Sequence, residues 1–348
     1  MEGIKEKVCS FESLYKAMAK CRKGVMWKDS VARYSNNGLA SVLKLCNSLE
    51  DNTYKIDDYH RFTIYEPKER EIVSTKLKDR VFQRSLCDNY LYDAITKSFI
   101  YDNCACQLGK GTTFAMDRLN CHMQRHFRKY GVNGYVLKCD IKNYFGSTKH
   151  STAKSVVAKS VKDKWALERV YDIVDSFSQP ENPGIGLGLG SQVTQLIQLA
   201  VLDSVDHFIK EELRIKQCIR YMDDFILIHH DKEYLKYCLE KIDAKIKELG
   251  LRLNVKKTQI FPLKQGLNFL GFKFRLTNTG KVLRVLNKEN IRKRKRKLRK
   301  FKKLVDEGKM TREKADECYR SWKAHAKKGN SYNLLKRMDE YYKNLWKE

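Results

Sequence analysis

The chain has 348 residues, 42% of them hydrophobic and 32% charged, and this length is enough to bury a core in two or three subdomains. Seventy Lys and Arg against 42 Asp and Glu give a formal net charge of +28, which favours a polyanionic partner, nucleic acid ahead of a membrane surface, over a generic basic protein that its charge keeps soluble. The sequence lacks a CxxC pair, a secretory signal and an apolar run of about 20 residues, so it predicts a cytoplasmic protein with reduced thiols and no membrane span.

The first half of the chain alternates helical and strand patterns. Residues 1–55 carry apolar residues at three- and four-residue spacing, which predicts a helical N-terminal extension. The run from Phe62 to Tyr65 predicts a short strand, and after a basic turn a helix is expected to begin near Lys78. A long helix is predicted over 114–130, and the strand that follows it delivers Asp140 at its end.

The second half contains a glycine-rich segment, a long amphipathic helix and a basic C-terminal region. The glycine-rich segment spans 181–195 and leads into an apolar helix pattern. A helix over 232–249 ends at a glycine, and 266–276 returns to strand character. The run 292–303 has ten basic residues in twelve, and a domain boundary is predicted near 278–288.

Two adjacent acids interrupt the apolar run "CIRYMDDFILIHH". Asp223 and Asp224 would each cost free energy to desolvate there without a partner, and a divalent cation is a common way to stabilise such a pair. Asp140, at the end of another apolar strand, is the candidate third acid. The alternative for the pair alone is a solvated turn, which the apolar residues on both sides disfavour.

Several blocks, in one order along the chain, resemble reverse transcriptases. "CDIKNYF" and "YMDD" resemble the palm of these enzymes, and "KEREIVSTKLKDRVFQRSL" with "FIYDNCACQLGKGTTFAMDRL" resembles the finger motifs of prokaryotic, non-retroviral members. "GLGLGSQVTQ" stands where the template-gripping glycine motif lies, and "LRLNVKKTQIF" and "LNFLGF" are similar to the two blocks after the catalytic hairpin. "SWKAHAKKGNSYNL" is similar to the thumb of the compact enzymes of diversity-generating retroelements. The resemblance covers roughly residues 55–348 and implies an α+β right-hand polymerase fold with fingers, an antiparallel palm sheet and a helical thumb.

The resemblance implies a catalytic centre built on the three acids. Asp140, Asp223 and Asp224, with the backbone carbonyl of Ile141, would hold two Mg²⁺ ions, for which Mn²⁺ can substitute. Lys257 matches the lysine that protonates the leaving pyrophosphate, and the adjacent Lys256 remains the alternative by one position.

The resemblance also implies a nucleotide-binding set. Its members are Lys68, Arg70, Phe145, Leu189, Gly190 and Gln195. Lys68 and Arg70 stand in a basic turn that would grip the triphosphate, where arginine offers bidentate geometry, and a solvated turn is the alternative. Phe145 would leave no room for a 2′-hydroxyl and so select dNTPs, unless it is an ordinary core residue.

The glycine-rich segment departs from the usual pattern of the family. Many reverse transcriptases have Pro-Gln-Gly where this chain has Gly188, Leu189 and Gly190, and Thr194 with Gln195 takes the place of the Ser-Gln pair of the retroelement enzymes. An aliphatic side chain cannot donate the hydrogen bonds of Gln. Contacts to the template or nucleotide should therefore be looser, as in an error-prone enzyme.

The remaining implied contacts are to the primer and template. The residues are Tyr221, Arg80, Lys110, Gly271, Arg292, Arg296 and Arg299. Arg80 is expected to brace the fingers or the template, Tyr221 to lie near the primer end unless it is an ordinary strand aromatic, and the arginines of the basic run to follow the backbone of a duplex.

The sequence thus predicts four regions and one activity. The regions are a helical extension (1–55), fingers with part of the palm (56–134), palm (135–284, with an interleaved template-grip segment at 181–196) and a basic helical thumb (285–348). The expected activity is error-prone RNA-directed DNA synthesis from dNTPs on an RNA template, in a diversity-generating retroelement or else an antiviral defence system. A dedicated non-coding RNA and a small accessory protein are the expected partners. A retired RNA-binding scaffold and an RNA-dependent RNA polymerase are the rivals.

Overall fold

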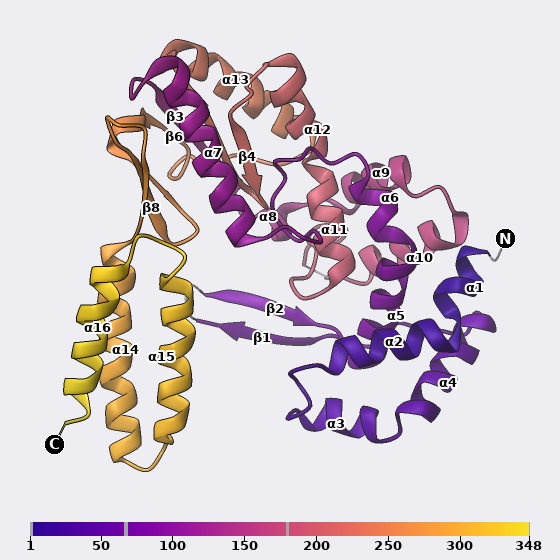
Figure 1. Ribbon diagram of the computed structural model, residues 1–348. Helices are drawn as coiled ribbons and strands as arrows, with labels where there is room; N and C mark the ends of the chain where they lie inside the picture. The colour runs from indigo at the N-terminus through magenta and orange to yellow at the C-terminus, as the bar shows by residue number, and fades with distance from the viewer. Residues whose placement is uncertain (1–2, 66–68, 179–180, 348) are drawn as a thin grey trace.

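The computed structural model describes residues 3–65, 69–178 and 181–347, and the first part of the chain is helical as expected (Figure 1). The N-terminal helices are α1 (Ile4–Cys9), α2 (Phe11–Arg22), α3 (Asp29–Asn36) and α4 (Gly38–Glu50). Buried apolar residues of α1, α2 and α4 pack against α5 (Leu77–Leu86) in one core. The N-terminal extension is therefore packed onto the helices that follow it.

A two-stranded hairpin separates this helical region from α5. β1 (His60–Ile64) pairs antiparallel with β2 (Arg70–Ser74). The π-helix η1 (Cys87–Leu91), α6 (Tyr92–Thr96) and the long helix α7 (Thr112–Tyr130) follow. The strand, the helix near residue 78 and the helix over 114–130 that the sequence predicts are thus present, each within two residues of its expected start.

The centre of the molecule is a four-stranded antiparallel sheet in the order β4-β5-β3-β6. Its strands are β3 (Tyr135–Asp140), β4 (Cys218–Tyr221), β5 (Asp224–His229) and β6 (Gln259–Pro262). Between β3 and β4 lie α8 (Tyr144–Ser147), α9 (His150–Ser160), α10 (Lys164–Asp175), α11 (Gln192–Val201), α12 (Asp203–His207) and η2 (Phe208–Glu212). Helix α13 (Lys232–Glu248) connects β5 to β6.

Both faces of this sheet are covered. Leu137 and Leu227 lie in a core with residues of α11 and α13, whereas Val136, Ile226 and Ile228 lie in a second core with residues of α7 and of a smaller sheet. Burial on both faces explains the continuous apolar runs of β3 and β5. Residues 221–224, at one end of the sheet, are only partly buried.

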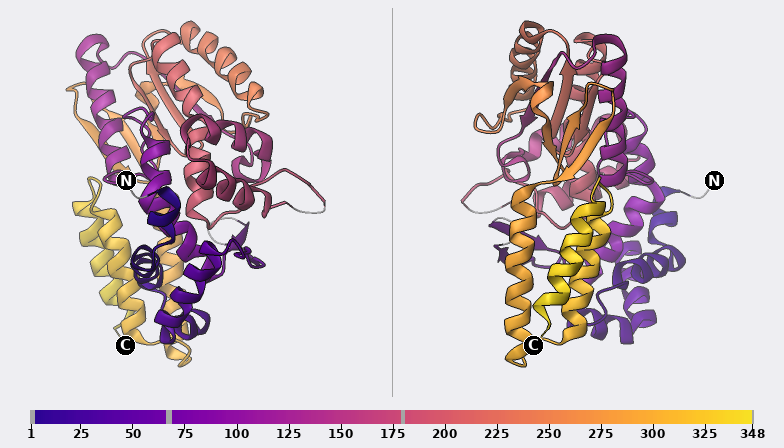
Figure 2. Two further views of the ribbon diagram at one scale, coloured as in Figure 1. Left: turned by 90° about the vertical axis from the view of Figure 1, so that its right-hand side faces the viewer. Right: turned by 60° about the vertical axis from the view of Figure 1, so that its left-hand side comes forward.

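The smaller sheet and a helical bundle complete the chain. The strands β7 (Leu267–Phe269), β8 (Phe272–Leu276) and β9 (Val282–Leu286) pair in sequence order after the 3-10 helix η3 (Leu263–Gln265). Helices α14 (Lys288–Asp306), α15 (Arg312–Ala326) and α16 (Tyr332–Leu345) form a bundle beneath this sheet in both views of Figure 2. The predicted boundary between 284 and 285 lies inside β9, because β9 stays paired with β8 up to Leu286.

Within the described part of the chain, no helix combines the length and the apolar character that a membrane span needs.

Candidate active site

The three acids meet at one end of the central sheet. Asp140 is the last residue of β3 and Asp224 the first of β5, and the two are paired directly across the antiparallel ladder. Met222 and Asp223 form the turn between β4 and β5. Side chains directly opposite in such a ladder have Cβ atoms about 5 Å apart, so this register brings together the acids that the sequence analysis selected.

Cationic and amide groups engage two of the acids. Lys257 Nζ lies 2.7 and 2.6 Å from the two carboxylate oxygens of Asp140, which is 5% exposed, and Asn254 Nδ2 donates to the same carboxylate at 3.1 Å. Lys138 Nζ lies 3.6 Å from Asp224 Oδ1. Lys138 and Asn254 were not selected from the sequence. The sequence did contain a signal for Lys138. It stands two positions before Asp140 in the same strand, so both side chains lie on the same face of the sheet.

The carboxyl cluster has an excess of negative charge. Burial raises the pKa of Asp223 to about 6, and the neighbouring Asp224 and Asp140 carboxylates add to that rise. Burial also raises the pKa of Asp224, although Lys138 opposes the effect. Carboxylates that are costly to ionise together suit a divalent cation, whose charge favours their ionised form.

The oxygen donors fit Mg²⁺, but they are not arranged as a finished coordination set. Among the residues that the structure describes, no three His, Cys, Asp or Glu side chains are grouped as ligands around one point. Lys257 instead neutralises Asp140. Ile141 lies opposite Leu253 in an antiparallel bridge. The Asn254 amide donates to the Asp140 carbonyl, and the Lys142 amide donates to the Arg252 carbonyl. In this pattern the Ile141 carbonyl points away from residues 252–254.

The raised pKa of Asp223 predicts a gain in stability for the Asp223→Asn variant in chelator. The contribution of Asp223 to the stability of the wild-type protein falls as the pH rises from about 4 to about 6, because the unfolded chain ionises Asp223 near 3.8 and the folded chain only near 6. Asparagine removes this penalty. The variant should be more stable by about 1–3 kcal/mol at pH 8 and equal to the wild type near pH 4. Urea unfolding at the two pH values measures this difference, and an equal gain at both would contradict the assigned ionisation.

A cavity of about 300 Å³ lies beside Phe145 and the glycine-rich segment. Its lining residues are Arg61, Glu71, Val73, Asn143, Phe145, Gly146, Phe177, Asn182, Ile185, Gly186, Leu187, Gly188 and Leu189. Phe145 is half-buried and stands at an angle to Tyr144, with the ring centroids 5.9 Å apart. The structure therefore brings together Phe145 and Leu189 of the predicted nucleotide-binding set.

The structure gives a packing reason for the two glycines beside Leu189. A Cβ on Gly188 would stand 2.2 Å from the Phe177 ring, and one on Gly190 would stand 3.0 Å from the Val73 carbonyl, at a φ of +130°. Thr194, where the retroelement enzymes have another residue, donates its hydroxyl to the Gly188 carbonyl at 2.8 Å. Gly188 and Thr194, two of the residues at which this segment departs from the pattern described above, thus both contribute to its local packing.

The other predicted nucleotide contacts are spread more widely. Lys68 lies outside the described residues, as does the side chain of Arg70, whose backbone belongs to β2. Gln195 and Gly190 line a separate cavity of about 680 Å³ that Arg80 also lines. Arg80 donates to Ser74 Oγ at 3.3 Å and to the Thr75 carbonyl at 3.1 Å, so it braces the end of β2.

The predicted primer and template contacts fall into three places. Lys110 Nζ donates to the carbonyls of Tyr101 and Asn103 at 3.0 Å each, so it holds its own loop. Tyr221 packs edge-on against Phe269, and Gly271 forms the β7–β8 turn with a φ of +87°. Arg292, Arg296 and Arg299 are exposed on α14.

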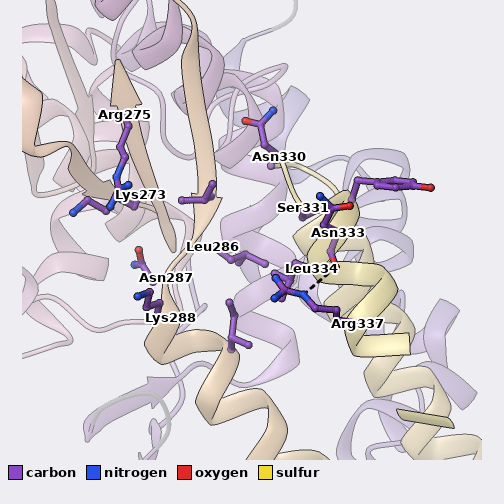
Figure 3. Close-up of a pocket in the computed structure, with 14 residues that line it drawn as sticks. Lys273, Arg275, Leu286, Asn287, Lys288, Asn330, Ser331, Asn333, Leu334 and Arg337 are labelled. Carbon is purple, nitrogen blue, oxygen red and sulfur yellow. Dashed lines mark hydrogen bonds between the residues drawn. The ribbon is translucent and has the colours of Figure 1, made fainter. Parts of the chain in front are cut away.

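A basic cavity lies where the smaller sheet meets the helical bundle (Figure 3). It has a volume of about 990 Å³, and Lys273, Arg275, Lys288 and Arg337 contribute cationic side chains to it. Figure 3 shows Lys273 and Arg275 of β8 on one side of the cavity and Arg337 of α16 on the other. This cavity adds to the positive surface of α14.

The chain was compared with known protein families and with solved structures. Residues 67–274 match the sequence model of the family described as "Reverse transcriptase (RNA-dependent DNA polymerase)". No curated protein matches the chain. The fold is similar to apo telomerase from Candida tropicalis, at 14% identity over 66% of this chain and 49% of that one (TM-score 0.51). A form of that enzyme truncated from its C-terminal domain aligns at 14% identity over 65% of this chain and 55% of that one (TM-score 0.50). The chain thus spans about half the length of these structures.

Proposed function

The chain belongs to the reverse transcriptase (RNA-dependent DNA polymerase) family. We propose that it is an RNA-directed DNA polymerase and that Asp140, Asp223 and Asp224 form its catalytic centre. The observation that carries this proposal is the register of the central sheet, which pairs Asp140 with Asp224 beside the turn that holds Asp223. In this assignment the central sheet is the palm, residues 56–134 supply the fingers with part of the palm, and the bundle from α14 onward is the thumb. Residues 1–55 are an extension that packs on the fingers.

The three carboxylates and the Ile141 carbonyl would hold Mg²⁺, or Mn²⁺ in its place. When bound, the ions neutralise the phosphate oxygens and activate the attacking hydroxyl. Asp223 would supply oxygen ligands from the turn, Asp224 from the start of β5 and Asp140 from the end of the paired strand β3. The raised pKa of Asp223 supports this role, since burial and the neighbouring Asp224 and Asp140 carboxylates disfavour its ionised form in the protein alone, and a divalent cation would favour that form.

Lys257 is the proposed proton donor. In the protein alone its ammonium group pairs with Asp140 at 2.6 Å, so it already lies at the edge of the carboxyl cluster. A primer 3′-hydroxyl would attack the α-phosphorus of the nucleotide and give its proton to water. The bond from the α-phosphorus to the oxygen of the β-phosphate would break, and the leaving pyrophosphate would accept a proton from Lys257. Lys256, one residue earlier, is exposed and pairs with none of the three acids in the hydrogen bonds of the described residues, which favours Lys257.

The nucleotide would lie between the acids and the cavity that Phe145 and Leu189 line. Phe145 would select the sugar, and Lys68 and Arg70 would grip the triphosphate. Leu189 offers no hydrogen bond where many family members have glutamine, so the contacts that check the templating pair are looser. This feature supports an error-prone enzyme.

The primer–template duplex would lie along the exposed basic face of α14. The triple variant Arg292→Gln, Arg296→Gln, Arg299→Gln should bind duplex more weakly, and the slope of log K against log salt should become shallower by about 2–3, because each phosphate contact contributes about 0.7–0.9. Fluorescence anisotropy over a salt series measures the slope. The matched control replaces Lys7, Lys236 and Lys241, which are far from α14 in sequence and lie on other helices, with Gln. A slope equal to that of this control would show that α14 does not contact the phosphates.

We favour a diversity-generating retroelement as the setting, with an antiviral defence system as the alternative. In either, a dedicated non-coding RNA would supply the template, and a small accessory protein would assist. The thumb-like segment "SWKAHAKKGNSYNL", which lies on α15 and the start of α16, supports the first setting. Sequencing the RNA that copurifies with the protein distinguishes the two, because template-repeat RNA supports the retroelement and a structured non-coding RNA without a coding target supports defence.

Primer extension on an RNA template tests the activity itself. Incorporation of dNTPs supports the proposal. Incorporation of NTPs alone would identify an RNA polymerase, and binding of RNA without incorporation would identify a scaffold on a retired fold.

A further inference from the structure

A fully buried arginine lies directly behind the catalytic turn. Arg220 is the penultimate residue of β4, is 0% exposed and is the largest of the fully buried side chains among the described residues. Its Nε lies 2.8 and 2.9 Å from the carboxylate oxygens of Asp206, and its Nη2 lies 2.6 Å from Asp206 Oδ2. Asp206, on α12, is also 0% exposed. The two residues form a closed ion pair beneath the sheet.

The guanidinium group makes two further hydrogen bonds, to backbone carbonyls. Nη2 donates to the Leu199 carbonyl of α11 at 3.0 Å, and Nη1 donates to the Met222 carbonyl at 3.1 Å. Met222 immediately precedes Asp223 in the turn. One rigid, planar side chain thus joins α12, α11 and the peptide that leads into Asp223.

Stability alone does not account for this arrangement. A buried ion pair loses so much hydration that a well-packed apolar pair of similar volume is often as stable or more so. The arrangement has a different effect at the turn, because only a long side chain with several fixed donors can meet Asp206 and the Met222 carbonyl together. The ion pair holds the guanidinium group in the orientation that this contact needs.

The turn requires such a restraint. Met222 has a φ of +55°, in the left-handed region that non-glycine residues avoid. A residue persists there only when its surroundings hold it. Arg220 Nη1 restrains the carbonyl of Met222, and on the side-chain end Cys106 Sγ lies 3.8 Å from Met222 Sδ.

We propose that Arg220, clamped by Asp206, is a positioning residue that fixes the Met222–Asp223 peptide and thereby the place of the Asp223 carboxylate relative to Asp140 and Asp224. This role rests on the proposed function, in which Asp223 is a metal ligand. Arg220 acts through the turn, since its side chain contacts the turn backbone from the buried side. The ligand whose binding it controls is the divalent cation held by the acids.

Two variants separate positioning from folding. Arg220→Lys keeps the buried charge but cannot donate in the fork geometry that reaches both Asp206 and the Met222 carbonyl. The double variant Arg220→Met, Asp206→Leu removes both charges together, so it leaves no unpaired buried ion, and it also lacks the bond to Met222. Arg118→Lys is the matched control, because Arg118 donates to the buried Asp102 at 2.7 Å without contacting the turn.

The measurements are the equilibrium binding of Mn²⁺ by electron paramagnetic resonance without nucleotide, and the rate of single dNTP addition as a function of Mg²⁺. Both Arg220 variants should bind Mn²⁺ about tenfold more weakly and require correspondingly more Mg²⁺, as is typical when a group that orients a metal ligand is lost. Their urea-unfolding curves and RNA affinity should match those of Arg118→Lys. Should the double variant not fold, Arg220→Lys decides alone.

A purely structural role would give a different result. It would lower the folded or active fraction, and with it the total rate, while each folded molecule kept the wild-type affinity for Mn²⁺ and the wild-type Mg²⁺ requirement. That outcome overturns the proposal. If instead the wild-type protein does not extend a primer, or Asp223→Asn leaves extension intact, the proposed function fails and not only the role of Arg220.

Discussion

The Asp223→Asn variant is expected to add dNTPs to a primer at least about a thousandfold more slowly than the wild-type enzyme. Asparagine keeps the volume of the side chain and one oxygen atom, but it removes the negative charge that the turn offers to a divalent cation. A bound cation contributes several kcal/mol to the stabilisation of charge at the reacting phosphate, and each 1.36 kcal/mol is tenfold in rate. Single-turnover addition of one dNTP under saturating Mg²⁺ measures the loss.

The same variant should otherwise be intact. RNA binding should change little, since the thumb and not the acid turn supplies the proposed phosphate contacts. Stability in chelator should increase at pH 8, as described above, so a folding defect cannot explain the loss of activity. Glu240→Gln, on the exposed face of α13, is the matched control and should keep the full rate. A variant at 223 that still extends primers at the control rate would remove Asp223 from the catalytic centre.

The Phe145→Ala variant is expected to accept NTPs, with the preference for dNTPs falling by about a hundredfold. The ring of Phe145 lines the cavity beside the glycine-rich segment, where it would exclude a 2′-hydroxyl by occupying its volume. Discrimination of this kind comes from a clash built against the wrong substrate, so removing the ring affects NTPs more than dNTPs. The ratio of kcat/KM for dGTP and GTP on one template measures the change.

Phe114→Ala is the control for the loss of an aromatic ring. Phe114 lies on α7 and packs edge-on against Tyr101, with centroids 5.4 Å apart, and it does not line the cavity of Phe145. Its variant should keep the wild-type preference for dNTPs. An unchanged preference in Phe145→Ala as well would place this residue among ordinary core aromatics, the alternative reading of its sequence position.

The sequence predicted the parts of the site that follow from local pattern. The pattern of two apolar strands with acids at their ends was enough to predict that Asp140, Asp223 and Asp224 lie together at one end of the sheet. The helices were predictable because their periodicity is local. The positions of Lys257 and Asp140 in sequence did not show that they form an ion pair.

The parts that sequence could not supply depend on contacts between distant segments. Arg220 and Asp206 are 14 residues apart in a region where charges would ordinarily be expected on the surface, and only the packing of α12 beneath β4 buries both. The reason for Gly188 lies in the Phe177 ring, eleven residues earlier and on a different segment. The burial of a charged pair and the close approach of a side chain to a distant backbone depend on tertiary packing, which no local sequence pattern specifies.

The ion pair between Lys257 and Asp140 means that the protein carries its own counter-ion for the acidic cluster. Domains whose folding depends on a bound metal unfold when a chelator removes that metal. This chain should behave in the opposite way. Removal of divalent cations with EDTA should abolish DNA synthesis without unfolding the protein, and adding Mg²⁺ back should restore synthesis without a refolding step.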